Sequence, residues 1–204
     1  MTATVSLRSP SQSQAPSVAF EPPPTKWLQG TWHVTHSTLP MWQTKRNVRI
    51  TYVILPSPSV SGTQPALERL DDTVYYQPLN SNKVKSIHGI DVASPTTAGA
   101  WDWRGTGWLK IASSHWEILG YGGAGDGTTD GPVKEASEDW VVTYFASTIF
   151  TPAGVDIYSR SPAGVSTETM AKIKEALGKI EDSEIKNLAE ELFEVTRNDP
   201  EGSV

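Results

Sequence analysis

Short runs of β-branched and aromatic residues, separated by Gly, Pro, Asn and Ser, occupy most of the chain from residue 26 to residue 162. Alternating apolar and polar positions within a run are typical of a strand, and the intervening residues are typical of turns. We place eight strands near 31–38, 47–55, 72–77, 84–92, 100–112, 115–121, 139–148 and 154–160. Eight strands with short connections predict an all-β fold, an up-and-down antiparallel barrel without exposed sheet edges.

The hydrophobic period changes after Arg160. Ser161-Pro162 interrupts the last strand, and Ser166 or Thr167 can cap a helix. Apolar residues then recur at helical spacing in two segments, Met170, Ile173, Leu177 and Ile180 followed by Ile185, Leu188, Leu192 and Val195. We expect these two helices to pack on the outside of the barrel; a partner-binding helix is the alternative.

The domain organisation follows from these patterns. Residues 1–25 are rich in Ser, Pro and Gln and cannot bury much apolar area, which predicts a disordered N-terminal arm. Beyond this arm we place the barrel at 26–162, the helical segment at 163–197 and a tail at 198–204. Two barrel connections, 56–65 and 122–131, are longer than a hairpin requires.

Composition narrows the class of protein. The chain has 204 residues and no cysteine, which excludes disulfides, thiolate metal sites and thiol nucleophiles. The lack of disulfides favours a reducing compartment, and the first residues contain no apolar signal segment, so we expect a cytoplasmic protein. Eight Trp and six Tyr suit a cavity lined by flat apolar surfaces.

Charge is unevenly distributed. The net charge is −6, and residues 166–204 hold ten acids against five bases. The barrel is therefore nearly neutral, and the acidity belongs to a solvated helical face. No basic stripe with interleaved aromatic residues is present, which argues against nucleic-acid binding.

Five segments, in order along the chain, are similar to motifs of the lipocalin (calycin) family: Trp27–Val34, Asn47–Tyr52, Gly107–Ile111, Glu138–Trp140 and Ile157–Arg160. The resemblance covers roughly residues 26–195 and is closest to the bacterial-type branch of that family. The lipid-attached cysteine of this branch is absent, so its membrane location does not carry over.

The resemblance implies where the two ends of the barrel lie. In lipocalins a Gly-x-Trp on the first strand and an Arg at the end of the last strand form the closed end of the barrel. The matching residues here are Gly30, Trp32 and Arg160, and the guanidinium can stack over the indole. A ligand cavity is then expected above this floor.

Strand parity predicts which side chains face the cavity. If Trp32 points inward, Val34 and His36 do too, and Arg160 sets the same face for Tyr158 and Asp156. The family match of the fifth strand turns Leu109 and Ile111 inward. The candidate ligand-binding residues are Val34, His88, Trp101, Trp103, Leu109, Ile111, His115, Glu117 and Tyr144.

One group of residues suggests chemistry. The first and last strands are neighbours in a closed barrel, so His36 can meet Asp156 or Tyr158. An imidazole oriented by a carboxylate is a competent acid or base near neutral pH. We therefore name His36, Asp156 and Tyr158 as candidate catalytic residues; a ligand-contacting or hydrogen-bonded His36 is the alternative.

Other motifs do not support a function. His33 and His36 are three apart on a strand and face opposite sides, so no metal site is expected. The segment 120–125 matches GxGxxG, but a loop rather than a helix follows it. No nucleophile-elbow serine and no flavin, nicotinamide or haem signature is present, so no cofactor is expected.

Three functions remain. The first is binding of a small hydrophobic molecule, aromatic or polycyclic, in the cavity. The second is cofactor-independent isomerisation, cyclisation or dehydration of a polyketide- or terpenoid-like intermediate in the same cavity, and the third is a scaffold acting through the acidic helices. The number of polar groups around the cavity separates the first two. We expect no membrane insertion and a monomer or weak homodimer.

Overall fold

The computed structural model describes residues 4–13, 19–56, 66–123 and 138–198. Most of the two long connections predicted at 56–65 and 122–131, and most of the predicted tail 198–204, lie outside these residues. In the described part of the chain, no helix is both long and apolar enough to cross a bilayer.

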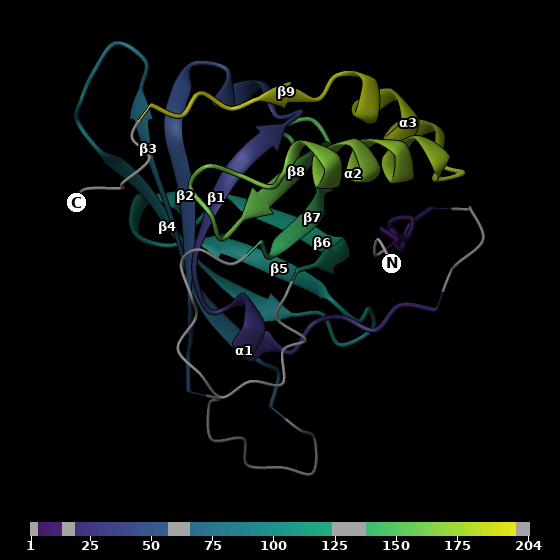
Figure 1. The fold of residues 1–204 in the computed structure, drawn as a ribbon. Coiled ribbons are helices and arrows are strands. Elements are labelled where there is room, and N and C mark those ends of the chain that lie inside the picture. Colours follow the sequence, from purple (N-terminus) through teal and green to yellow (C-terminus); the bar gives the residue numbers. More distant parts are fainter. Residues whose placement is uncertain (1–3, 14–18, 57–65, 124–137, 199–204) are drawn as a thin grey trace.

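The eight-stranded antiparallel barrel is confirmed (Figure 1). Its strands are β1 Gly30–Ser37, β2 Lys45–Ile54, β3 Arg69–Pro78, β4 Lys85–Ala93, β5 Ala100–Gly105, β6 Ser113–Gly122, β7 Trp140–Phe145 and β8 Gly154–Ser159. Each strand pairs with the next, and β1 pairs with both β2 and β8. That double pairing closes the sheet, so β1 has no free edge.

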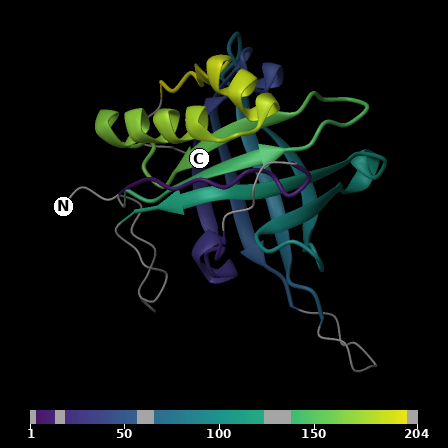
Figure 2. The same ribbon diagram turned by 90° about the vertical axis from the view of Figure 1, so that its right-hand side faces the viewer.

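The helices cover one side of the barrel, as Figures 1 and 2 show. Helix α2 spans Thr167–Lys179 and helix α3 spans Ser183–Glu190. Ser166 caps α2, because its hydroxyl accepts a hydrogen bond from the Thr169 amide. That amide, in the first turn of the helix, would otherwise have no backbone acceptor. The protein has two hydrophobic cores. One fills the barrel, and the other lies between the apolar faces of the two helices and the outward side chains of β7 and β8.

Two predicted elements end earlier than expected. The fifth strand stops at Gly105, where a Cβ atom would lie 2.4 Å from the Leu109 carbonyl oxygen, and the chain continues into the 3₁₀ turn η2, Gly107–Leu109. The second helix ends at Glu190. The chain then forms the short strand β9, Phe193–Glu194, which pairs with the end of β1.

The predicted disordered arm 1–25 differs from the structure over residues 4–13. This segment runs along the outer face of β6 (Figure 2). The Arg8 amide donates to the Leu119 carbonyl oxygen at 2.8 Å. The Arg8 side chain also forms a 2.9 Å ion pair with Glu117, which is buried. The Leu7 side chain joins the core beneath α2. These contacts hold the segment in place despite its polar composition.

The closed end lies beside the short helix α1, Thr25–Leu28 (Figure 1). Trp32 is fully buried there, and its indole donates to the Leu28 carbonyl oxygen at 2.8 Å. The Arg160 guanidinium carbon lies 3.7 Å from the centre of the Trp32 ring. The same guanidinium donates to the carbonyl oxygens of Trp27, Gln29 and Thr31, which ties the chain before β1 to the end of β8.

Candidate functional site

The barrel interior carries three acidic side chains from three different strands. Asp72 lies on β3, Asp91 on β4 and Asp156 on β8, and their exposed fractions are 7%, 0% and 1%. In the strand order, β8 lies across the barrel from β3 and β4. The site therefore has carboxyl groups on opposite walls.

Each carboxyl group sits in an environment that resists ionisation. Burial raises the pKa of Asp91 to about 7, against the stabilising hydrogen bond from the Trp116 indole. Burial likewise raises the pKa of Asp156 to about 7. The pKa of Asp72 is raised well above its ordinary value by burial and by the neighbouring Asp91. Near neutral pH the interior thus holds carboxyl groups that can donate as well as accept a proton.

Aromatic rings form a stack beside these acids. The Trp116 ring lies 5.9 Å from Tyr52 and 6.0 Å from Trp101, centre to centre, with interplanar angles of 20° and 18°. The Trp116 indole donates to Asp91 Oδ1 at 2.8 Å, so the stack and the acid are linked. Flat apolar surfaces next to polar groups are typical of sites for small cyclic molecules.

Several polar atoms of this interior have no partner within the described residues. Asp72 Oδ1, Asp91 Oδ2 and the Trp101 indole nitrogen are buried and form no hydrogen bond. Buried polar atoms in native proteins are almost always hydrogen-bonded to protein, water or ligand. The arrangement suits a molecule, or water, that offers both acceptors and donors. The described residues contain no group of three or more His, Asp or Glu side chains placed to hold a metal ion.

The prediction that His36 faces the interior is wrong. A β-bulge shifts the register between Val34 and His36, so that Val34 pairs with Tyr158 but His36 pairs with Ile157. Ser37 takes the inward position and donates to Asp156 Oδ1 at 2.5 Å. His36 lies on the outer face opposite Glu194 of β9. Burial together with Lys174 and Arg197 lowers the pKa of His36 to about 4.

Asp156 and Tyr158 do face the interior, as parity predicts. Tyr158 is 1% exposed and belongs to the barrel core. Burial and the nearby Asp156 raise the pKa of Tyr158 well above its ordinary value, so the phenol stays neutral. Two of the three candidate catalytic residues therefore share the site, and the histidine does not.

The other predicted histidine contacts lie on the outer wall. His88 Nε2 is 2.8 Å from Asp71 Oδ2, and its Nδ1 is 2.9 Å from the Thr106 hydroxyl. His115 Nδ1 is 2.8 Å from Asp102 Oδ1, and Glu117 binds the N-terminal segment. These residues alternate with inward neighbours such as Trp116, which explains their outward direction.

The remaining predicted ligand contacts divide between interior and exterior. Val34, Trp101 and Trp103 belong to the barrel core or pack against it. Tyr144 faces outward and donates to Glu184 of α3 at 2.6 Å. Ile111 is 82% exposed in a turn, and Leu109 packs over Gly105, because the strand that would have turned them inward ends before both.

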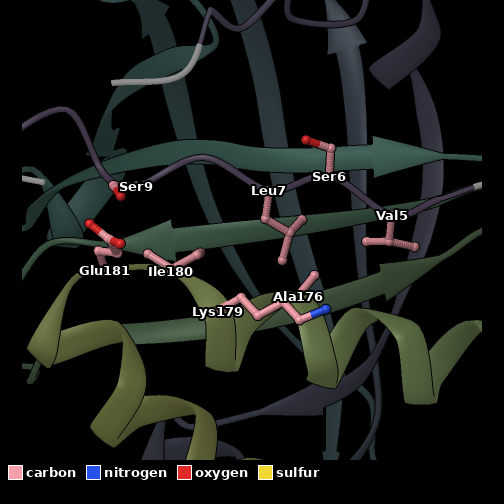
Figure 3. Close-up of a pocket in the computed structure, with 8 residues that line it drawn as sticks. All are labelled: Val5, Ser6, Leu7, Ser9, Ala176, Lys179, Ile180 and Glu181. Carbon is pink, nitrogen blue, oxygen red and sulfur yellow. The ribbon is translucent and has the colours of Figure 1, made fainter. Parts of the chain in front are cut away.

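A separate groove of about 380 Å³ lies outside the barrel, between the N-terminal segment and α2 (Figure 3). The side chain of Leu7 points toward the helix and that of Ser6 points away from it. The charged group of Lys179 in this groove is already paired with Glu175 at 2.6 Å. The groove therefore lacks the buried polar groups that mark the barrel interior.

Sequence reasoning missed Asp72, Asp91, Tyr52 and Trp116. A signal was available for Asp91, which stands alone as an acid within the apolar run IHGIDVA. Asp72 follows Asp71, and only one of two adjacent strand residues can face inward. Leu70 and Val74 lie on the same face of β3 as Asp72, and apolar residues are expected to face the interior. Parity along β3 therefore predicts that Asp72, not Asp71, points inward.

The fold and this interior define a lipocalin-like barrel. No family model matches the chain. It is 29% identical over 187 residues to the "Botcinic acid biosynthesis cluster B protein 12" of Botryotinia fuckeliana (strain B05.10), covering 89% of this chain and 78% of that protein. It also matches the structure of a siderocalin, Ex-FABP, described as functioning through dual ligand specificities. That match has a TM-score of 0.51 and 14% identity over 84% of this chain and 95% of the other, and it shows the fold alone.

Proposed function

We propose that this protein binds a small hydrophobic molecule bearing hydroxyl or carbonyl groups inside the barrel, in a pathway of secondary metabolism. The observation that carries the proposal is the set of buried carboxyl groups next to a stack of aromatic rings. An apolar ligand alone would leave Asp72 Oδ1 and Asp91 Oδ2 without hydrogen-bond partners, at a cost of about 1–3 kcal/mol each. The similarity to a protein of a biosynthesis cluster supports the pathway assignment.

Tryptophan quenching with a panel of oxygenated aromatic and polycyclic compounds tests the binding. We expect saturable quenching with dissociation constants near micromolar, about −8 kcal/mol. Trp103→Ala should weaken binding, since Trp103 packs against the interior core. Trp27→Ala is the matched control, because Trp27 is also half-buried but packs on Trp32 and Tyr121 at the closed end. Equal losses in the two variants would contradict an interior site.

Acid–base catalysis on the bound molecule is a second candidate function. It is favoured by carboxyl groups on opposite walls, two of them with pKa values raised to about 7. A neutral carboxyl on one wall can give a proton to a carbonyl or hydroxyl oxygen while a carboxylate on the other removes one from carbon. Together these transfers isomerise the molecule, promote cyclisation or, with departure of the protonated hydroxyl as water, dehydrate it.

Isosteric substitutions separate catalysis from binding. If the acids are catalytic, Asp91→Asn or Asp156→Asn should lower turnover of a candidate intermediate by about 100-fold, with affinity changed by about twofold or less. His36→Ala is the control, because the imidazole lies on the outer face. Product formation that both Asn variants leave unchanged would reject catalysis and leave a carrier.

The setting of this activity is also part of the proposal. We propose that the protein works in the cytoplasm, which the lack of cysteine supports. We further propose that the barrel and the helical segment act as one unit, because the outward side chains of β7 and β8 share a core with α2 and α3. Fractionation of the producing cell, with the protein detected by antibody, tests the location.

A further inference from the structure

The end of the barrel opposite Trp32 carries most of the exposed large apolar side chains of the described residues. In an up-and-down barrel the connections β1–β2, β3–β4, β5–β6 and β7–β8 lie at one end, here the end opposite Trp32. We call this the rim and define it as residues 38–45, 79–85, 106–112 and 146–153. Among the described residues, six of the nine exposed large hydrophobic side chains belong to the rim: Met41, Leu79, Val84, Ile111, Ile149 and Phe150.

Each of the four rim connections contributes at least one of these side chains. The most exposed are Ile149 at 91% and Ile111 at 82%, followed by Phe150 at 64%. The Thr148 hydroxyl accepts hydrogen bonds from the amides of Phe150 and Thr151, both at 3.0 Å. This turn fixes Ile149 and Phe150 at the tip of their connection, so their exposure is built into the local backbone.

The charge of the rim is opposite to that of the whole chain. The rim contains four lysines, Lys45, Lys83, Lys85 and Lys110, and no Asp or Glu, in a chain with a net charge of −6. Lys83, Lys85 and Lys110 are exposed. Exposed apolar side chains with lysines between them and no acidic residues complement a surface that has an apolar layer beneath negatively charged groups.

We propose that the rim docks on the surface of a membrane containing anionic lipids, with the apolar tips entering the interface and the lysines contacting the headgroups. Exposed apolar patches mark interaction sites, and basic residues near an anionic leaflet each add attraction to it. Docking by short loops needs no spanning helix. This end of the barrel then faces the lipid phase, in which a hydrophobic molecule dissolves. This inference goes beyond the proposed function and does not depend on it.

Vesicle co-sedimentation of the full chain without added ligand tests the proposal. We expect binding to vesicles of phosphatidylcholine with phosphatidylserine, weaker binding to phosphatidylcholine alone, and a decline with added salt. The double variant Ile149→Ser with Phe150→Ser should lower the partition coefficient at least 10-fold. Its matched control is Val53→Ser with Leu67→Ser, two exposed apolar residues outside the rim, which should bind as wild type.

A second variant tests the contribution of the rim lysines to membrane binding. Lys83→Gln with Lys85→Gln should weaken binding to anionic vesicles about 10- to 30-fold, as expected for about fivefold per lysine. Lys179→Gln with Lys186→Gln on the helices is the control and should have little effect. All variants alter exposed side chains, so unchanged melting temperatures will show that they fold.

Three outcomes would overturn the proposal. Wild type that stays in the supernatant with anionic vesicles would reject it, and so would equal losses in rim and control variants. A concentration-dependent dimer that only the rim variants dissociate would assign the apolar tips to a second copy of the chain. Because no ligand is present, a failure to bind small molecules leaves these readouts unchanged.

Discussion

Trp32 connects helix α1 to the last barrel strand at the closed end. It is fully buried, donates through its indole to Leu28, and carries the Arg160 guanidinium over its face. Trp32→Ala should therefore lower the free energy of unfolding by about 3–5 kcal/mol, measured by urea denaturation. Trp103→Ala, at a half-buried position, should cost less. A Trp32→Ala protein as stable as wild type would show that the closed end does not support the barrel.

Asp91 shows how one interior residue links stability to pH. Its pKa is raised from 3.8 to about 7, so between these values the folded state holds more protons than the unfolded state. The free energy of unfolding should then fall as pH rises from about 4 to about 7 and level off above. Asp91→Asn keeps an acceptor for the Trp116 indole but has no charge to bury.

We expect Asp91→Asn to match wild type near pH 4 and to exceed it by about 1–3 kcal/mol at pH 8. Urea denaturation at the two pH values measures the difference. Asp102→Asn is the control, since that side chain is 60% exposed and its loss should give no such gain at pH 8. An Asp91→Asn protein less stable than wild type at pH 8 would mean that the ionised carboxylate is stabilised by the barrel.

At the scale of elements, the N-terminal segment behaves as an added layer on β6. Arg8 and Glu117 form an ion pair with side chains 10% and 1% exposed, and Ser11 also donates to this carboxylate. Arg8→Ala leaves a buried charge without its main partner and should cost about 3–5 kcal/mol in urea denaturation. Arg8→Ala with Glu117→Gln removes that charge and should recover part of the loss.

Arg104→Ala is the control for the Arg8 variants, because Arg104 is exposed on the neighbouring β5 and its loss should change stability by about 0.5 kcal/mol or less. Equal effects of Arg8→Ala and Arg104→Ala would show that the segment does not pack on β6. The result would also support the expectation, drawn from its composition, that the arm is disordered.

Elements with regular periodicity were predictable, and irregular ones were not. Period-two alternation located all eight strands, and helical spacing located α2 and the start of α3. The bulge after Val34 has no Gly or Pro to signal it, yet it reverses the direction of His36. Likewise, the early end of β5 depends on the close approach of Leu109 to Gly105, a tertiary contact that spacing cannot indicate.

The whole molecule combines a rigid floor, an acidic interior and an apolar, basic rim. The floor was predictable from the resemblance to lipocalins, because its Gly-x-Trp and Arg stand in two short motifs of that family. The acidic interior was predictable only residue by residue, since strand parity gives the inward direction of Asp156 and Asp72, but the approach of Asp91 to Asp72 requires the register of β3 and β4. The N-terminal layer was missed because polar composition hides the few contacts that hold it, such as Arg8 with Glu117.

This arrangement predicts that ligand binding is coupled to proton uptake. A neutral molecule that accepts hydrogen bonds from the protonated carboxyl groups of Asp91 and Asp156, whose pKa values are already raised to about 7, should raise them further. The complex then holds more protons than the free protein, so affinity should fall about 10-fold as pH rises from 6 to 8.5, measured by tryptophan quenching. Asp91→Asn with Asp156→Asn should flatten this dependence. Affinity that instead rises with pH would mean that the ionised carboxylates contact a cationic group, and the bound molecule would then be an amine rather than a neutral compound.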